Sequence, residues 1–132
     1  MNNKKIFLIV DDDMEDCEFF CEAISEIDSS YKCFKAHNGE DALLKLRDEV
    51  LPRPDYIFLD LNMPRMNGRE CLQELKKDTD LSVIPVIIYT TSSSKKDKED
   101  TRKLGASYFI TKPSEFRTIR SEIINIINQK SH

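Results

Sequence analysis

Short apolar runs alternate with segments of helical spacing along the whole of this 132-residue chain. Runs such as Ile6–Val10 contain too many successive apolar residues for a strand with one face in water, so they predict strands buried on both faces. Strict strand–helix alternation predicts an α/β fold: a doubly wound, five-stranded parallel sheet with five helices and right-handed crossovers. The predicted strands span residues 6–10, 31–37, 56–60, 85–89 and 108–111.

Capping residues delimit the predicted helices. Asp13 is a good N-cap for the first helix, and Asp16 lies in its first turn, where a carboxylate suits the helix dipole. Gly105 is suited to the end of the fourth helix, a highly polar segment that starts near Ser94. The other helices are predicted over residues 40–49, after Gly68, and from Lys112-Pro113 onward.

Length and charge restrict the classes of function. The chain has the length of one domain at about 150 residues per domain, and its net charge of −4 argues against direct nucleic-acid binding. Residues 6–10 are too short for a signal peptide, and no segment approaches the length of a membrane span, so we expect a cytoplasmic protein without membrane insertion.

Four cysteines are therefore expected to be reduced thiols: Cys17, Cys21, Cys33 and Cys71. Cys17 and Cys21 lie one helical turn apart, so a zinc pair is conceivable. No companion CxxC motif or histidine cluster accompanies them, which favours packing in the core.

The chemistry is expected where the strands end, because ligands of such sheets bind beyond the carboxyl ends of the strands. Asp11, Asp12 and Asp13 follow the first strand. Helix capping explains Asp13, and solvated turn carboxylates are the alternative interpretation for the other two. Carboxylates this close raise one another's pKa unless a cation intervenes, and oxygen ligands suit Mg²⁺.

The remaining strand ends carry Asp60, Thr90 and Lys112. Individually, Thr90 is more often only a turn hydroxyl and Lys112 a solvated lysine, whereas a turn cap is the less favoured interpretation of Asp60, because a carboxylate after a buried strand is costly unless it is paired or ligating. Together with the acidic first loop they provide a carboxylate nucleophile, a metal site and two donors for phosphoryl oxygens, which favours phosphoryl chemistry. The same acidic loop would repel a nucleotide or flavin phosphate there.

These motifs resemble the receiver domain of bacterial two-component response regulators. The resemblance extends from Lys5 to about Asn128. It rests on Val-Asp-Asp-Asp at 10–13, Leu-Asp-Leu-Asn-Met-Pro-Arg-Met-Asn-Gly at 59–68, Thr90-Thr91 and Lys112-Pro113. It implies a flavodoxin-like receiver topology and a single receiver domain over residues 1–132, similar to stand-alone, chemotaxis-type regulators. Without an output domain, such a chain is expected to signal by binding a downstream protein.

By this resemblance Asp60 is the phosphoacceptor, and a histidine kinase or histidine phosphotransfer protein is the donor. The protein would be a regulatory phosphoacceptor rather than an enzyme, catalysing only its own phosphotransfer and dephosphorylation. Asp12 would ligate Mg²⁺ directly and Asp11 through water. Asp60 and the backbone carbonyl of Asn62 would complete the protein ligands.

The resemblance also assigns the contacts to the phosphoryl group. Lys112 and the Thr90 hydroxyl would contact its oxygens, as would the backbone N–H groups of Asn62 and Thr91. Family members often have a cis Lys-Pro peptide, which would turn Lys112 inward. Phosphorylation would draw Thr90 toward Asp60.

Phe109 is expected to rotate inward behind Thr90 on phosphorylation, although a strand core residue is the alternative interpretation. Phe109 lacks the hydroxyl of the tyrosine usual at this position, which leaves open any readout through a tyrosine hydrogen bond. Thr91 is β-branched and would narrow the path of an attacking water, slowing self-dephosphorylation. The polar stretch 93–102 would contribute to a partner-binding face.

Two other functions are considered. An aspartate-nucleophile phosphohydrolase would need a general acid two residues after Asp60, where Asn62 cannot act as one. A receiver that binds partners without phosphorylation is disfavoured because the acidic cluster, Thr90 and Lys112 are all present.

Overall fold

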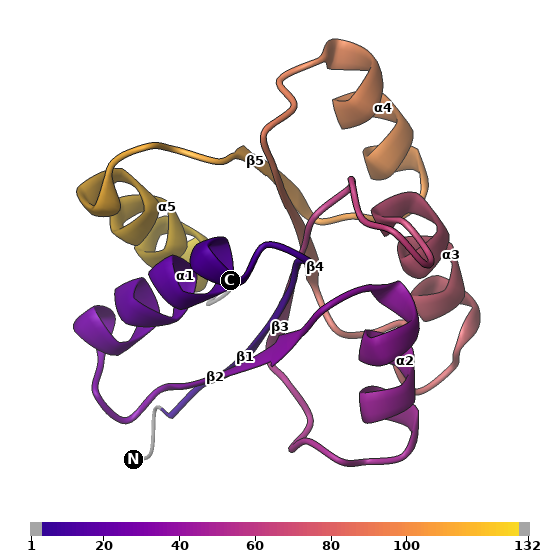
Figure 1. The fold of residues 1–132 in the computed structure, drawn as a ribbon, viewed down its shortest axis with the longest axis horizontal. Coiled ribbons are helices and arrows are strands. Elements are labelled where there is room, and N and C mark those ends of the chain that lie inside the picture. The colour runs from indigo at the N-terminus through magenta and orange to yellow at the C-terminus, as the bar shows by residue number, and fades with distance from the viewer. Residues whose placement is uncertain (1–3, 130–132) are drawn as a thin grey trace.

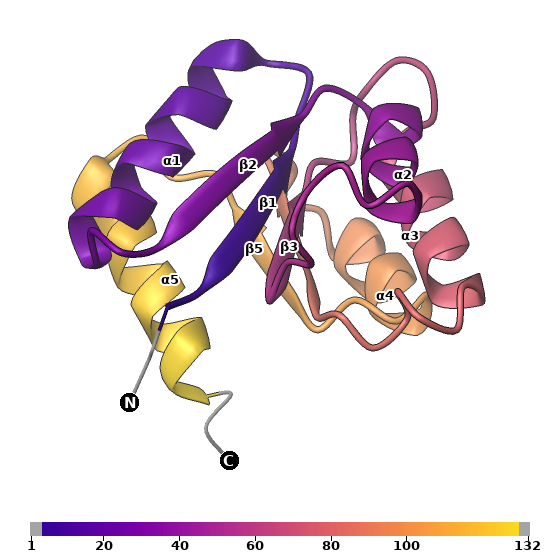
Figure 2. The same ribbon diagram turned by 90° about the horizontal axis from the view of Figure 1, so that it is seen from below.

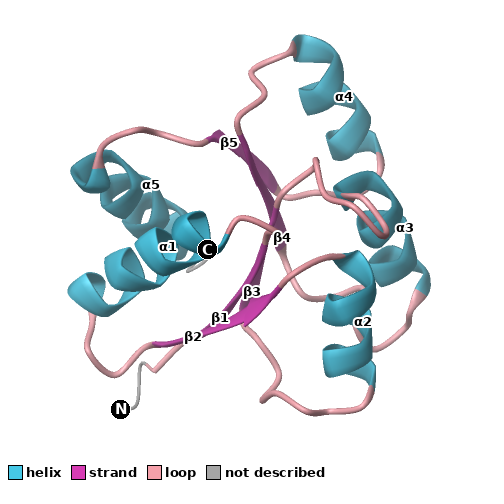
Figure 3. Cartoon of the chain, viewed as in Figure 1, coloured by secondary structure: helices cyan, strands magenta, loops and turns pink. Residues whose placement is uncertain are grey.

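The computed structural model describes residues 4–129, which form a five-stranded parallel sheet with helices on both faces. The strands lie in the order β2-β1-β3-β4-β5, and every neighbouring pair is parallel (Figure 3). Their bounds are β1 Ile6–Val10, β2 Lys32–Ala36, β3 Tyr56–Leu59, β4 Val86–Thr90 and β5 Tyr108–Thr111. The predicted fold class is therefore confirmed, with strand ends shifted by one residue in places.

Five helices cover the sheet in two groups. Helices α1 and α5 lie on one face, and α2, α3 and α4 lie on the other (Figures 1 and 2). Within the described residues no helix is long and apolar enough to cross a membrane. The bounds are α1 Met14–Ile27, α2 Gly39–Arg47, α3 Gly68–Lys77, α4 Lys95–Lys103 and α5 Phe116–Gln129.

The sheet separates two apolar clusters because alternate residues of a strand point to opposite faces. In β1, Leu8 and Val10 pack with α2 and α3, while Phe7 and Ile9 pack with α1 and α5. All four are fully buried, as the apolar run predicts. The edge strand β2 is half-exposed along most of its length, which explains its weaker apolar pattern.

The segment after β5 differs from the sequence expectation. Helix α5 begins at Phe116 rather than at Lys112-Pro113. No peptide bond among the described residues is cis, so the expected cis Lys112–Pro113 bond is wrong for this structure. A trans bond remains the favoured form before proline. The loop nevertheless turns Lys112 inward, leaving its side chain only 10% exposed.

Candidate functional site

The strand order reverses between β1 and β3, and this is where two of the predicted aspartates lie. Asp11 follows β1, and its N–H donates to the Ala36 carbonyl of β2 at 3.0 Å. Asp60 follows β3, and its N–H donates to the Val10 carbonyl of β1 at 3.0 Å. These ladder bonds fix both backbones at the edge where ligands of α/β sheets bind.

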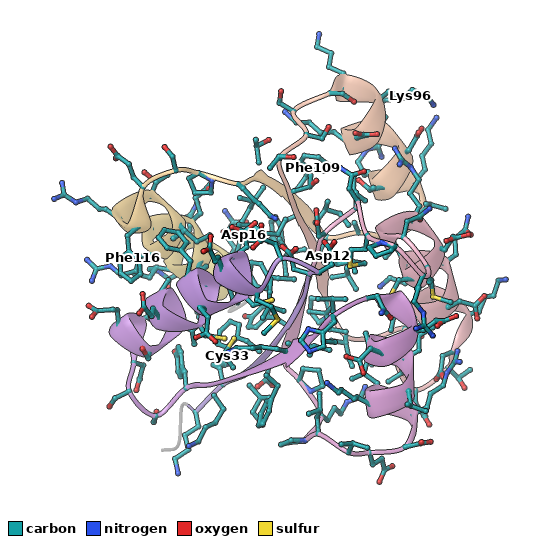
Figure 4. All side chains as sticks on the ribbon, viewed as in Figure 1. Asp12, Asp16, Cys33, Lys96, Phe109 and Phe116 are labelled. Carbon is teal, nitrogen blue, oxygen red and sulfur yellow. The ribbon has the colours of Figure 1, made fainter. Side chains whose placement is uncertain are left out.

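Three carboxylates converge there. One oxygen from each of Asp11, Asp12 and Asp60 lies within 4.8 Å of the other two. Asp11 is fully buried and Asp60 is 5% exposed, whereas Asp12 is exposed (Figure 4). Burial raises the pKa of both Asp11 and Asp60, because it disfavours their charged forms. Such an oxygen cluster fits a hard divalent cation.

Lys112 supplies one positive charge to this cluster. Its Nζ lies 2.7 Å from an Asp11 oxygen, 2.7 Å from an Asp16 oxygen and 3.9 Å from an Asp60 oxygen. The ammonium also lies 5.6 Å from the centre of the Tyr89 ring. Burial opposes the charged form of Lys112, but the carboxylates outweigh it and raise the lysine pKa.

The sequence did not single out Asp16 as a site residue. It suits the dipole of the first turn of α1, and its N–H bonds to the Asp13 cap. Because α1 begins at the same edge of the sheet as the acidic cluster, a first-turn carboxylate can also reach the site. That position, rather than any motif, was the clue in the sequence.

Thr90 ends β4 beside Asp60, as predicted. Its side chain is fully buried, and its hydroxyl makes no well-formed hydrogen bond within the described residues. The nearby hydroxyl still favours the ionised form of Asp60, as do the backbone N–H groups of Leu61 and Asn62, although burial dominates and raises the Asp60 pKa. The Thr90 hydroxyl is therefore available for another acceptor.

Asn62 and Thr91 are both exposed beside this edge. Asn62 lies in the loop between β3 and α3, and Thr91 follows β4. Their side chains are therefore accessible from the solvent side of the predicted phosphoryl position.

The loop between β3 and α3 holds Asp60 in place through close backbone packing. Arg65 and Met66 have φ angles of 53° and 76°, which turn the chain back toward the sheet. The Gly68 N–H then donates to the Leu61 carbonyl at 3.0 Å. A Cβ atom on Gly68 would lie 2.2 Å from the Asp60 carbonyl oxygen, so this approach requires glycine.

An ion pair that the sequence did not predict holds the loop after β4. Asp97 of α4 pairs with Arg69 of α3 and accepts a 2.6 Å hydrogen bond from the Ser92 hydroxyl. The Thr90–Thr91 segment is thereby connected to α3. Neither partner lies in a recognisable motif, and their contact depends on the packing of two helices.

Phe109 lies half-buried on β5, with the Lys98 Nζ 5.8 Å from its ring centre (Figure 4). Both side chains line a hollow of about 320 Å³ between α4 and β5. Phe109 is thus on the strand beside Thr90, as expected, and has not fully entered the core.

The cysteines do not form the conceivable zinc site. Within residues 4–129, the one group of three or more potential metal ligands is Asp11, Asp12 and Asp60. Cys17 and Cys71 are buried in the core, as predicted. Cys21 and Cys33 are half-buried and contact one another.

Comparisons with known proteins show what this chain is similar to. The family model described as the response regulator receiver domain matches residues 7–124. Response regulator Rcp1 from Synechocystis sp. is 31% identical over 122 residues, which cover 89% of this chain and 83% of that protein.

Two solved structures are similar throughout. The phosphorylated cyanobacterial phytochrome response regulator RcpA is 30% identical with a TM-score of 0.84, covering 93% of this chain and 91% of its own. The Mn²⁺-bound form of Rcp1 is 30% identical with a TM-score of 0.81, covering 92% and 91%. The family model matches the chain from within β1 into α5, a range that includes Asp11, Asp12 and Asp60, and the chain therefore belongs to the response regulator receiver domain family.

Proposed function

We propose that this protein is a phosphorylatable switch of a two-component phosphorelay in which Asp60 accepts the phosphoryl group. Receiver domains are the regulatory phosphoacceptors of such systems. The observation that carries the assignment to Asp60 is its position. It belongs to a cluster of three carboxylates, with a buried lysine and an uncommitted threonine hydroxyl beside it.

The local chemistry suits nucleophilic attack by Asp60. Lys112 stands 3.9 Å from the nearer Asp60 oxygen, so the carboxylate is not tied up in a close ion pair. Its oxygen attacks phosphorus of a phosphohistidine, forming an O–P bond while the P–N bond breaks and its electrons return to the imidazole. The Thr90 hydroxyl, which makes no well-formed hydrogen bond within the described residues, then donates to a phosphoryl oxygen, as do the backbone N–H groups of Asn62 and Thr91.

Asp11, Asp12, Asp60 and the backbone carbonyl of Asn62 would hold a divalent cation, which we propose is Mg²⁺. The oxygen-only donor set supports this choice, as does the excess of three carboxylates over the one neighbouring lysine. Rcp1, which is similar to this chain, has a structure in a Mn²⁺-bound form. When bound, the cation neutralises negative charge on the phosphoryl oxygens.

The partners that this chemistry implies are a phosphohistidine donor and a target protein. The donor would be a histidine kinase or a histidine phosphotransfer protein, and we propose that the protein meets it in the cytoplasm. A receiver unit over residues 1–132 would act through its target rather than by turning over a small substrate, with no direct binding to nucleic acid. Movement of Thr90 and Phe109 would alter the surface formed by β5 and α4, where the target would bind.

Two alternatives are weaker. A phosphohydrolase would need an acid near the leaving group, and the exposed Asn62 cannot supply a proton as an acid does. A module that binds without phosphorylation would not need the buried charges of Asp11, Asp60 and Lys112, which are costly unless they have a role.

Phosphorylation by acetyl phosphate with Mg²⁺, followed by intact mass and peptide mapping, tests the proposal. We expect one added phosphoryl group per chain, located on Asp60 and abolished by Asp60→Asn. Asp13→Asn is the matched control, because asparagine retains the N-cap of α1 and Asp13 lies outside the carboxylate cluster.

Full phosphorylation of the Asp60→Asn variant, or a phosphoryl group located on another residue, would refute the assignment. A wild-type chain that acquires no phosphoryl group, and shows no NMR shift at Thr90 or Phe109 with beryllofluoride and Mg²⁺, would favour the module that acts without phosphorylation. Turnover of a small phosphomonoester would favour the phosphohydrolase.

A further inference from the structure

A thiol pair lies outside the phosphoacceptor site, where α1 packs against the edge strand β2. The Sγ atoms of Cys21 and Cys33 are 2.7 Å apart, closer than two unbonded sulfur atoms normally approach. Cys21 also contacts the backbone carbonyl of Cys33, with 3.9 Å between sulfur and oxygen. Figure 4 shows Cys33 on β2, where sulfur atoms gather beneath α1.

A neighbouring ion pair fixes this register. Glu18 and Lys35 join α1 to β2, with 2.5 Å between the ammonium nitrogen and a carboxylate oxygen. Cys21 lies three residues after Glu18 on the helix, and Cys33 lies two residues before Lys35 on the strand. Residues three apart lie on the same face of a helix, and residues two apart lie on the same face of a strand. The ion pair and the thiol pair therefore form two successive links between α1 and β2.

We propose that Cys21 and Cys33 form a reversible redox pair that a peroxide converts to an intramolecular disulfide. An S–S bond is about 2.05 Å long, so the two sulfurs need to approach by only about 0.7 Å. Both side chains are half-buried, which leaves the pair accessible to a small oxidant. The link would covalently join α1 to the exposed edge of the sheet.

The chemistry assigns a separate role to each sulfur. The Cys21 thiolate attacks one peroxide oxygen and the O–O bond breaks. The departing hydroxide takes up a proton to become water and leaves a sulfenic acid. The Cys33 sulfur then attacks the Cys21 sulfur, forming the S–S bond as a second water leaves with the Cys33 proton. Two thiols are oxidised, and one peroxide is reduced to two waters.

Local electrostatics support this order. The contact with Cys33 lowers the pKa of Cys21, with help from the Lys35 ammonium, and outweighs the opposing effects of burial and of Glu18. Burial raises the pKa of Cys17 and of Cys71 to about 12 in each case, which makes them poor nucleophiles. Oxidation is therefore expected to be selective among the four cysteines.

Thiol counting with disulfide mapping on the full chain tests the proposal. Hydrogen peroxide is added, the reaction is quenched, and the protein is unfolded and alkylated before intact mass and peptide analysis. We expect alkylatable thiols to fall from four to two in the monomer, with a Cys21–Cys33 linked peptide, and to return to four after dithiothreitol. Cys21→Ser and Cys33→Ser should each abolish that peptide, whereas Cys71→Ser should retain it.

Four intact thiols after peroxide, a link through Cys17 or Cys71, or disulfides only between chains would each overturn the proposal. Mapping of the wild-type chain decides the matter even if one serine variant fails to fold. The Asp60→Asn variant should form the same disulfide, so the redox pair and the phosphoacceptor are tested separately.

Discussion

Replacement of Gly68 by alanine tests whether the loop after β3 places Asp60 by direct backbone packing. The added Cβ would lie 2.2 Å from the Asp60 carbonyl oxygen, 2.7 Å from the Leu61 Cα and 2.9 Å from the Asp60 carbonyl carbon. All three are backbone atoms, so no side-chain rotation relieves the clash. Ordinary contact begins near 3.4 Å, so the Asp60 carbonyl must withdraw by about 1.2 Å.

Two effects of different size follow from this displacement. Overpacking costs about 1–3 kcal/mol of folding stability, and the reduced freedom of the unfolded chain offsets about 0.4–1 kcal/mol. A misplacement of about 1 Å in a reacting group can lower a rate by about 100-fold. We therefore expect Gly68→Ala to lower the urea midpoint modestly. The same variant should be phosphorylated by acetyl phosphate about 100-fold more slowly than the wild type.

Gly39→Ala is the matched comparison. Its Cβ would lie 2.7 Å from the Met66 Cγ and 2.8 Å from the Met66 carbonyl oxygen, so it strains the far end of the same loop. We expect a similar loss of stability with a much smaller loss of phosphorylation rate. Equal loss of rate in both variants would show that general loosening of the loop matters, rather than displacement of Asp60. A Gly68→Ala variant with the wild-type rate would refute the packing argument itself.

Four other changes probe the charged edge. Mg²⁺ at about 100 times its dissociation constant should stabilise the fold by about 2.7 kcal/mol in urea titrations, and by less in Asp12→Asn. Lys112→Met should lower stability by about 3–5 kcal/mol without Mg²⁺, because it leaves Asp11 without its cation, and Mg²⁺ should recover part of the loss. Thr90→Val should leave the urea midpoint unchanged or slightly raised, since the hydroxyl has no well-formed hydrogen bond. The same variant should no longer show the NMR shift that beryllofluoride causes at Phe109. Thr91→Ala should shorten the lifetime of the aspartyl phosphate, and an unchanged half-life would contradict the steric argument.

Strand ends were predictable from sequence because buried strands leave a strong apolar pattern and a polar residue at the end of each run is conspicuous. Asp11, Asp60, Thr90 and Lys112 were found in this way, and parallel strands necessarily bring such ends to one edge. The family resemblance then supplied roles that the residue pattern alone did not.

Contacts between helix and strand were not predictable in the same way. Sequence spacing made a Cys17–Cys21 pair conceivable, although core packing was favoured, and it gave no sign of the Cys21–Cys33 contact that the structure shows. Which residues of α1 face β2 depends on how the helix rotates to bury its apolar stripe. The Arg69–Asp97 pair depends in the same way on how α3 meets α4.

Charge balance at the strand ends explains why the unphosphorylated site favours a cation and why phosphorylation can act as a switch. Asp11, Asp12, Asp16 and Asp60 carry four formal negative charges against one positive charge on Lys112, and two of the carboxylates are buried. A divalent cation reduces this excess from three charges to one. A phosphoryl group adds roughly −1.5 to −2 while Asp60 loses its own charge on esterification. In the unphosphorylated site Lys112 lies 2.7 Å from Asp11, which follows β1, and 2.7 Å from Asp16 in α1. A shift of Lys112 toward the phosphoryl group would break both ion pairs and release α1 from the end of β1.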